Sequence, residues 1–539
     1  MKLQFRVYRK IKKSGLFDSV FYLINNRDVR IADMDPIAHY IRYGWKEGRN
    51  PSEKFNTSFY LNSNPDVKES GKNPLLHYIE VGSKQGRLPH PPDNHPMSEY
   101  NDSESRIFGE NISINTYPRS QSITEIGVKE IVDKKISIII PTKNAGPDFA
   151  FLMKVLRLQK GFKEIEIIIV DSGSNDETIE IAENYDATIV KIDPSVFSHS
   201  FARNLGAEEA TGDYLLFTVQ DALPPSSTWL YELFQVIKDQ NVVAVSCAET
   251  PREDADLFYR QISWNNYNFL GVNDRDRIFS LPERLDNESL RKNGQLSDLA
   301  NLISKEIFDQ YHYRFGYAED LDLGIRLIKY GYKIAFLGSV RIIHSHNRSP
   351  YYFLKRGYVV NQFLSNIFND FVMPKISMPS FVPDIAFTYV FLIRLIKYIN
   401  NLPKHLTPEL FGTKVNELFS MRYDFEYPGE LPAISEQYMD EQTKEFLEDI
   451  IITSGFKYAG QKYDGFLTTA FLGYVNIVIN YLKNTYETID DLLLVEIKEC
   501  FYKAFSTLVE THLAYCNQNR TGEELQDMDK MHSLLMEGV

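Results

Sequence analysis

The chain has few cysteines. Only Cys247, Cys500 and Cys516 occur in 539 residues, and they lie far apart. This spacing provides neither a disulfide framework nor a cysteine-based zinc site. A protein without disulfides suits a reducing compartment, so we expect a cytoplasmic location. The net charge of −14 argues against nucleic acid as the main partner, because phosphate binding needs a broad basic face.

Long apolar runs are missing as well. No segment reaches the roughly 18 apolar residues that a transmembrane helix needs. The most apolar candidate, 386–399, contains Arg394 and Lys397, which predicts a buried or interfacial amphipathic helix. The first 13 residues carry six Lys/Arg and no acid, and they lack the apolar stretch of a signal peptide. They fit either a basic amphipathic helix on the inner face of the cell membrane, as a peripheral contact, or a solvated helix face.

An internal repeat occupies the N-terminal part. Residues 17–51 align with 55–89 at a constant offset of 38, and sixteen of the 35 aligned positions are identical. Each copy predicts a short helix, a turn and a second helix that begins at Pro36 or Pro74. One histidine per copy is compatible with a metal site, but a packed core residue is the more ordinary interpretation. We therefore predict a small helical docking module over 1–89.

The remaining chain divides into three parts that differ in composition and hydrophobic pattern. Residues 90–133 are rich in Pro, Ser, Asn and Asp, which predicts a linker. From residue 134 continuous apolar strands, such as "KKISIIIPT", alternate with helical segments. This alternation predicts an α/β domain over 134–370, with a mostly parallel sheet and helices on both faces. Helical spacing without strand alternation predicts a mainly α-helical C-terminal domain over 371–539.

Polar residues follow the predicted strands at their carboxyl ends, where ligands bind in sheets of this kind. The first strand ends in "PTKNAG" and not in a Gly-rich fingerprint or a Walker loop, which disfavours dinucleotide and NTP binding. A later strand runs through "DYLLFTVQDALPP", in which Asp221 stands alone after the apolar residues. Asp221 either caps a turn or binds a metal or phosphate.

Several motifs, in order, resemble a known family: Pro141-Thr142, "DSGSND" at 171–176, "ARNLGAEEATGDYLLF" at 202–217, Asp221, "YAEDLDLGIRLIKYGYKI" at 317–334 and "IIHSHNRS" at 342–349. Together they resemble family 2 glycosyltransferases with the Rossmann-like GT-A fold, and bacterial rhamnosyltransferase-like members most. The resemblance covers roughly residues 134–350. It implies the GT-A fold for the α/β domain.

The resemblance also implies a divalent metal, Mg²⁺ or Mn²⁺, because charge develops on the diphosphate of a nucleotide-sugar donor. Such families usually supply an Asp-x-Asp triplet, but the aligned triplet here is Val219-Gln220-Asp221. Asp221 is therefore expected as the main ligand, together with a histidine of "HSH". We favour His344 over His346 for that second ligand.

Donor binding is implied for a larger set of residues at the same edge of the sheet. The segment around 172–176 is also good helix-start chemistry, so an N-cap role is the alternative there. Arginine suits a diphosphate through its bidentate fork. The expected donor-binding residues are Pro141, Thr142, Asn144, Asp171, Ser172, Gly173, Ser174, Asp176, Arg203, Asn204, Gln220 and Asp221.

For catalysis, the resemblance implies Asp320 as the general base that takes the proton of the acceptor hydroxyl, with Glu319 assisting. The alternative is an acidic first turn of a helix, which the helix dipole favours. Trp264 and Asp298 are expected on the acceptor side, although a core tryptophan is a strong competitor for the first.

The sequence thus predicts an inverting, metal-dependent glycosyltransferase that moves a sugar, with rhamnose as the candidate, from a nucleotide-diphosphate donor. The implied acceptor is a glycan or a lipid-linked glycan of a bacterial surface polysaccharide. A catalytically inactive GT-A-like protein that binds sugar or acts as a scaffold is the alternative, since Val219 replaces the first acid of the triplet. A nucleotidyltransferase would normally show a Gly-rich basic loop after the first strand, and "PTKNAG" is a poor one.

Overall fold

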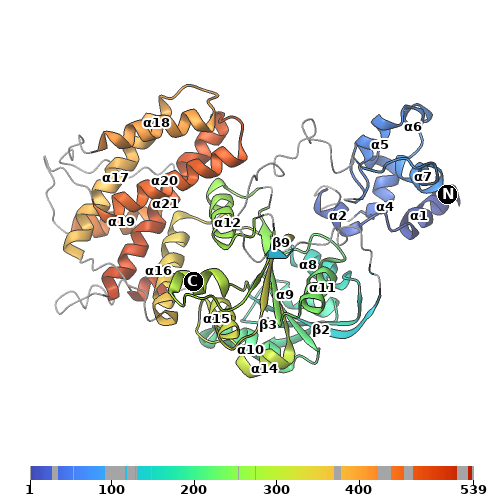
Figure 1. Cartoon of the computed structure of the whole chain (residues 1–539), viewed down its shortest axis with the longest axis horizontal. Helices are drawn as coiled ribbons and strands as arrows, with labels where there is room; N and C mark the ends of the chain where they lie inside the picture. Colours follow the sequence, from blue (N-terminus) through green and yellow to red (C-terminus); the bar gives the residue numbers. More distant parts are fainter. Residues whose placement is uncertain are drawn as a thin grey trace.

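A computed structural model shows three groups of elements, with helices at both ends of the molecule and a sheet between them (Figure 1). The ranges that it describes are 2–26, 29, 34–90, 116–117, 128, 130–368, 378–422, 439–453, 465–518 and 532–536, without residues 53, 147, 253 and 274. Most of the predicted linker, 90–133, lies outside these ranges, as does the predicted boundary between 370 and 371.

The two repeat copies use equivalent contacts. The Tyr22 hydroxyl lies 2.9 Å from His39 Nδ1, and the Tyr60 hydroxyl lies 3.0 Å from His77 Nδ1. These hydrogen bonds confirm the histidines as packed residues of the module. The helices of this part are α1 (Lys2–Lys13), α2 (Ser19–Ile24), α4 (Pro36–His39), α5 (Thr57–Ser63), α6 (Pro65–Ser70) and α7 (Pro74–Glu80).

Two expectations for this part need adjustment. The turn predicted in the second copy is itself a short helix, α6, because Pro65 occupies its first turn and Gly71 ends it in the left-handed conformation. The basic helix α1 does form, but Ile11 is fully buried and Val7 and Tyr8 pack against the core of the repeats. Val7, Tyr8 and Ile11 therefore face the repeat module, which leaves the membrane contact without structural support.

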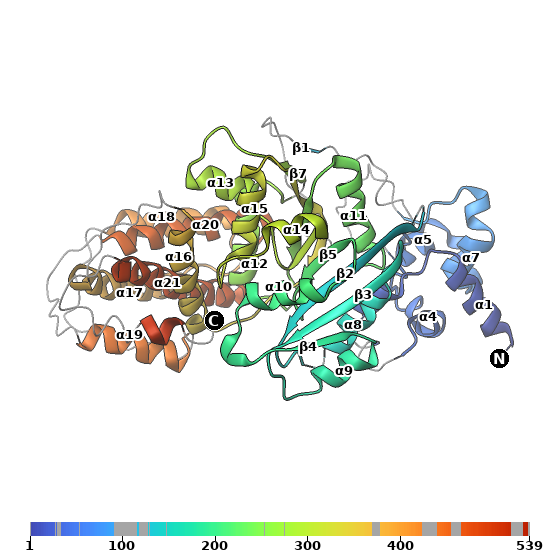
Figure 2. The same cartoon turned by 90° about the horizontal axis from the view of Figure 1, so that it is seen from below.

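The central part is a nine-stranded sheet with the order β1-β7-β9-β6-β8-β5-β2-β3-β4. Figure 2 shows β2, β3 and β4 side by side in this sheet. The strands are β1 (Thr116–Tyr117), β2 (Val132–Thr142), β3 (Phe162–Asp171), β4 (Thr188–Lys191), β5 (Tyr214–Thr218), β6 (Ala244–Thr250), β7 (Asp276–Phe279), β8 (Ala300–Ser304) and β9 (Ile334–Ile343). Only β7 and β8 run against the other seven. This confirms the mostly parallel sheet.

Side chains of the central strands alternate between two cores, one on each face. In β2, Ile138 and Ile140 pack with α8 and α11, whereas Ile139 packs on the opposite face with α10 and α15. Burial on both faces explains the continuous apolar runs. The helices around the sheet are α8 (Phe149–Arg157), α9 (Thr178–Asn184), α10 (His199–Glu209), α11 (Trp229–Gln240), α13 (Asn287–Asn293), α14 (Lys305–Tyr311) and α15 (Glu319–Lys329).

The C-terminal elements of secondary structure that the structure describes are all helices. They are α16 (Pro350–Ile367), α17 (Met378–Asn400), α18 (Pro408–Ser420), α19 (Glu441–Thr453), α20 (Phe466–Thr485) and α21 (Asp491–Gln518), and they share a core with α12 (Leu257–Leu270). The segment 386–399 is part of α17 and is largely buried there, as one of the two predicted alternatives requires. Among the residues that the structure describes, no helix is long and apolar enough to cross a membrane.

Helices α12 and α16 belong to this core although they precede residue 370. Phe258 of α12 and Phe353 of α16 meet edge to face within it, with their ring centres 4.6 Å apart. The hydroxyl of Tyr474 on α20 donates to Gln261 of α12 at 2.5 Å. The sheet and the C-terminal helices are therefore joined through a common apolar core, and the domain boundary near 370 stays a prediction.

Candidate active site

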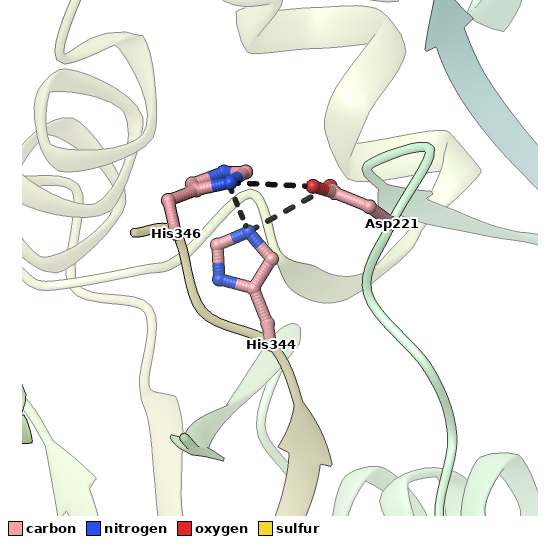
Figure 3. A group of neighbouring side chains, drawn as sticks. All are labelled: Asp221, His344 and His346. Carbon is pink, nitrogen blue, oxygen red and sulfur yellow. Dashed lines mark hydrogen bonds and ion pairs between the residues drawn. The ribbon is translucent and has the colours of Figure 1, made fainter. Parts of the chain in front are cut away.

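Three side chains that are far apart in the sequence meet at the carboxyl ends of the strands. Asp221, His344 and His346 each offer one ligand atom, and these atoms lie within 4.8 Å of one another (Figure 3). Asp221 Oδ1 lies 3.7 Å from His344 Nε2, and Asp221 Oδ2 lies 3.5 Å from His346 Nδ1. The two Nε2 atoms are 3.1 Å apart. This is the predicted aspartate with both candidate histidines.

The backbone explains how these residues meet. Leu223 and Ile343 form an isolated antiparallel bridge, with N–H···O distances of 2.8 and 2.9 Å. Leu223 follows Asp221 by two positions, and Ile343 immediately precedes His344. Ala222 and Leu223 pack into the core below the sheet edge, which fixes the turn that carries Asp221. The "DALPP" turn and the end of β9 are thereby locked together.

A second set of side chains orients His344. Its Nδ1 lies 2.9 Å from Glu249 Oε2 and 3.1 Å from the Tyr259 hydroxyl. The Tyr259 hydroxyl itself donates to Glu249 Oε2 at 2.8 Å, because burial, followed by the charge of Glu249, keeps its pKa well above the ordinary value. Nδ1 is thus the protonated nitrogen that faces Glu249. Nε2 is left to face Asp221 and His346.

The donor set fits a divalent metal. Burial lowers the pKa of His346 to about 4, the strongest influence on this ring, so the imidazole is neutral at neutral pH. Metals bind neutral imidazole, and a carboxylate oxygen with two imidazole nitrogens suits Mn²⁺ or a similar divalent ion. An outer carboxylate on the other nitrogen of a ligating histidine is the usual arrangement at metal sites, and Glu249 supplies it.

The end of β3 forms a tight loop around Asp171. Its carboxylate accepts hydrogen bonds from Thr142 Oγ1 at 3.1 Å, Ser174 Oγ at 2.5 Å, and the backbone N–H groups of Gly173 and Ser174 at 3.0 and 2.9 Å. Ser172 Oγ donates to the Thr142 carbonyl at 3.1 Å. The side chain of Asp171 therefore holds the loop in shape.

The neighbouring loops are bound to this one. The Asn144 N–H donates to Ser174 Oγ at 2.8 Å, and the Gly146 N–H donates to Asp176 Oδ2 at 3.2 Å. The Gln220 side chain accepts from the Lys143 N–H at 2.9 Å, which ties the end of β5 to the end of β2. Asp176 also accepts from the N–H and the hydroxyl of Thr178 at the start of α9, but the N-cap residue of that helix is Glu177, whose side chain makes no capping hydrogen bond. Pro141 is the penultimate residue of β2, so the structure brings the predicted donor residues of β2, β3 and β5 together.

A buried acid network lies at the start of α15. Arg203 of α10 is 1% exposed, and its guanidinium donates to both Glu319 and Asp298. The N–H of Asp298 donates to Asp320 Oδ2 at 3.4 Å, and the Leu321 N–H donates to Asp320 Oδ1 at 2.7 Å. The predicted base, its predicted assistant and the predicted acceptor-side aspartate are therefore neighbours.

Burial shifts the titration of these acids. It raises the pKa of Glu319 to about 8, against the opposing charge of Arg203. It raises the pKa of Asp320 to about 7, and the negative charge of Asp298 acts in the same direction. Burial also tends to raise the pKa of Asp298, but the positive charges around it, that of Arg203 first, together lower that pKa. The pKa of Asp320 is therefore suited to a general base that works at neutral pH.

Two residues expected at the donor have protein partners here. Two guanidinium nitrogens of Arg203 form hydrogen bonds, and they donate to Glu319 and Asp298. This arginine therefore positions those two acids. Asn204 donates to the Tyr313 carbonyl at 3.0 Å and accepts from the Tyr313 N–H at 3.1 Å. Donor binding by these two side chains stays a prediction without a contact that supports it.

Trp264 was expected on the acceptor side, but its surroundings are those of a packed core residue. It lies on α12 and packs against the C-terminal helical core, with its ring centroid 5.6 Å from that of Tyr481. This is the competing interpretation, a packed tryptophan. Its role at the acceptor stays a prediction.

Arg356 is a residue near the site that the sequence did not predict. It lies on α16, and its Nε donates to the Tyr317 hydroxyl at 3.2 Å. Its positive charge lowers the pKa of His346 and that of Asp298, so it acts on the metal group and on the acid network at once. Among the described residues, Tyr317 is its only hydrogen-bond partner. In the sequence, the segment "FLKRGY" looks like an ordinary basic helix turn, so no local signal distinguishes this arginine.

Comparison with known proteins gives a matching family. The Glycosyl transferase family 2 profile matches residues 137–296. The O-antigen chain rhamnosyltransferase RfbN of Salmonella typhimurium is 28% identical over 222 residues, which are 40% of this chain and 68% of that protein. The O-antigen chain rhamnosyltransferase WbaN of Salmonella anatum is 29% identical over 228 residues, with coverages of 40% and 67%.

Among solved structures, the mannosyltransferase PcManGT from Pyrobaculum calidifontis, in complex with GDP-Man and Mn²⁺, is similar at 19% identity with a TM-score of 0.35. That match covers 45% of this chain and 66% of the other.

The family match covers β2 to the loop before Asp298, and so contains the Asp171 loop and Asp221. The chain therefore contains a glycosyl transferase family 2 domain, the domain of a glycosyltransferase.

Proposed function

We propose that the protein is an inverting, metal-dependent glycosyltransferase that uses a nucleotide-diphosphate sugar. The observation that carries this proposal is the placement of Asp221, His344 and His346 at the same sheet edge as the Asp171 loop. Rhamnose is the first candidate sugar, because the relatives RfbN and WbaN are named O-antigen chain rhamnosyltransferases. A glycan or lipid-linked glycan is the corresponding acceptor.

The carboxyl ends of β2, β3 and β5 offer a preformed donor site. Hydrogen bonds among Asp171, Ser174 and Asn144 hold these loops before any ligand arrives, which lowers the ordering cost of binding. Asp221, His344 and His346 would hold the metal. A bound divalent ion would neutralise the charge that develops on the departing diphosphate.

Asp320 is the proposed general base. The acceptor hydroxyl oxygen forms a bond to the anomeric carbon, the bond from that carbon to the diphosphate oxygen breaks, and Asp320 takes the hydroxyl proton. Attack opposite the leaving group inverts the anomeric configuration. Burial and the charge of Asp298 keep the pKa of Asp320 at about 7, which suits proton uptake at neutral pH.

The test is release of nucleoside diphosphate from dTDP-, GDP- and UDP-sugars with Mn²⁺, measured for the wild type, Asp320→Asn and Asp309→Asn. Asp309 lies on α14 and pairs with Lys305 on the surface, so its variant is the control. We expect turnover of one donor class that needs metal, is lost in Asp320→Asn and is retained in Asp309→Asn. Binding without turnover in the wild type would favour the inactive sugar-binding alternative.

A further inference from the structure

A cavity of about 530 Å³ lies where the segment that follows His346 meets the C-terminal helices. Its volume is in the range of roughly 300–1,000 Å³ that is typical of small-molecule sites. Its lining residues come from the segment after His346, the N-terminus of α12, the start of α19, and α21. They are Asp256, Asn347, Arg348, Ser349, Pro350, Met439, Asp440, Glu499 and Lys503.

The walls of this cavity are fixed by hydrogen bonds between those elements. Asn347 Nδ2 donates to the Asp254 carbonyl at 2.6 Å, and Asn347 Oδ1 accepts from the Asp256 N–H at 2.8 Å. Lys503 of α21 pairs with Asp256 Oδ2 at 2.5 Å. Asp440 accepts from the Tyr351 N–H at 3.0 Å, which attaches the start of α19 to α16. The cavity is thus a built feature of the fold.

Two charged side chains in this lining have no hydrogen bond or ion pair with any described residue. One is Arg348, whose guanidinium lies 5.3 Å from the ring centre of Tyr352. The other is Glu499, and burial raises the pKa of its carboxyl. An arginine offers hydrogen-bond donors and a carboxylate offers acceptors, so the pair suits a ligand that both accepts and donates hydrogen bonds.

These groups restrict the chemistry of the ligand. Asp256, Asp440 and Glu499 outweigh Arg348 and Lys503, so a strongly anionic ligand is disfavoured. Vicinal hydroxyl groups donate to a carboxylate and accept from a guanidinium at the same time. A neutral sugar has all of these properties. Asn347 of the cavity lining is the residue that follows His346 of the proposed metal site in the chain.

We propose that this cavity binds a sugar unit of the glycan acceptor, with Glu499 and Arg348 holding its hydroxyl groups. The inference rests on the proposed glycosyl transfer and adds where the acceptor lies. The C-terminal helices then contribute to the reaction by supplying Glu499 of α21, a residue outside the family 2 match. The acceptor site is accordingly shared between the sheet domain and the helical part.

The test uses the full chain, with methyl rhamnoside and rhamnose di- and trisaccharides as acceptor probes. We compare the wild type, Glu499→Gln, Arg348→Gln and the control Arg284→Gln, whose arginine is exposed on another surface. In the first two variants we expect the acceptor KM to rise about tenfold, the value of one charged hydrogen bond. The donor KM and metal-dependent donor hydrolysis in water should stay unchanged.

The outcomes separate the two proposals. A wild type that hydrolyses no nucleotide-sugar contradicts the proposed function itself. A wild type that hydrolyses the donor, but transfers to none of the probes or keeps its acceptor KM in both variants, overturns the acceptor cavity alone. A circular dichroism spectrum for each variant checks that folding is retained.

Discussion

Glu249 Oε2 lies 2.9 Å from Nδ1 of His344, on the side of the ring that faces away from Asp221. The carboxylate is held in place by hydrogen bonds from Tyr259 and Ser263, each 2.8 Å long. Glu249 thereby fixes both the ring orientation and the tautomer that leaves Nε2 to face the proposed metal. None of these three residues is a ligand, so their role is visible only in the fold.

We expect Glu249→Gln to weaken Mn²⁺ binding about 10- to 100-fold, the usual loss when an outer carboxylate is removed from a ligating histidine. Isothermal titration with Mn²⁺ on the full chain measures it. Ser263→Ala is the control, since it keeps the carboxylate and removes only one of its hydrogen bonds. Equal Mn²⁺ affinity in Glu249→Gln and the wild type would exclude Glu249 from the metal site.

Asp221→Ala should abolish Mn²⁺ binding and leave the fold intact. The Asp221 side chain is 28% exposed and faces only the two histidines among the described residues, whereas its backbone carbonyl, which the substitution keeps, accepts from Arg252. Surface substitutions of this kind change stability by roughly 0.5 kcal/mol or less. Thermal unfolding without metal would therefore match the wild type. A large loss of stability would return Asp221 to the role of a turn-capping residue.

Asp320→Asn tests the base through two pH profiles. Asp320 must be ionised to accept a proton, and its pKa is raised to about 7, so kcat/KM of the wild type should fall below about pH 7. At about pH 8, where Asp320 of the wild type is ionised, the variant should lose roughly 100-fold or more in rate, and this difference should shrink as the pH falls below about 7. A wild-type profile without this acidic limb, together with residual activity near the wild-type level, would assign the base elsewhere.

The same substitution has an opposite effect on stability. Because burial raises the pKa of Asp320 above its ordinary value of 3.8, the protonated form stabilises the folded state, and that contribution is lost as the pH rises through about 7. Asparagine cannot ionise, so Asp320→Asn should unfold at a higher temperature than the wild type at about pH 8. The difference should vanish near pH 4. Scanning calorimetry at both pH values measures it, with Asp309→Asn again as the control.

Much of this fold could be predicted because burial on two faces leaves a strong pattern in the sequence. Ile138, Ile139 and Ile140 form a continuous apolar run, and they indeed pack into two different cores. The grouping of Asp221 with His344 and His346 was expected from the family motifs. The Leu223–Ile343 bridge that brings them together involves two ordinary apolar residues, and nothing in their sequence surroundings indicates it.

Contacts between side chains that are far apart in the chain could not be predicted from the sequence. Arg203 was expected at the donor phosphates because its residue type suits them, yet it is buried between Glu319 and Asp298. Its choice between phosphate and carboxylate depends on how α10 faces α15, which is a property of the packed fold. Arg356 is the reverse case, a residue in an unremarkable helix that the packing of α16 brings next to the site.

Arg356→Gln should weaken nucleoside diphosphate binding with little effect on the nucleoside. Its guanidinium acts on His346 and Asp298, and hydrogen-bonds only Tyr317 within the described chain, so it is available to a diphosphate. We expect about a tenfold or larger loss for the diphosphate in the presence of Mn²⁺, measured by titration calorimetry. Arg284→Gln is the control. Equal losses for diphosphate and nucleoside would indicate a structural role instead.

The repeat module offers a matched pair of glycines that tests whether its two copies are built alike. A Cβ at Gly44 would lie 1.9 Å from the Tyr22 hydroxyl oxygen, and a Cβ at Gly82 would lie 2.0 Å from that of Tyr60. Each hydroxyl is held by the histidine of its own copy. Gly44→Ala and Gly82→Ala should therefore each destabilise the module by roughly 1–3 kcal/mol, the cost of overpacking.

Hydrogen exchange over residues 2–90 would report this loss separately from the rest of the chain. Removing the clashing oxygen should restore part of the stability, so Gly44→Ala with Tyr22→Phe should exchange more slowly than Gly44→Ala alone. Gly473→Ala on α20 is the control, because a Cβ there meets no atom within 4 Å. If Gly44→Ala and Gly82→Ala both leave exchange unchanged, the tyrosine–histidine contacts do not hold the two copies together.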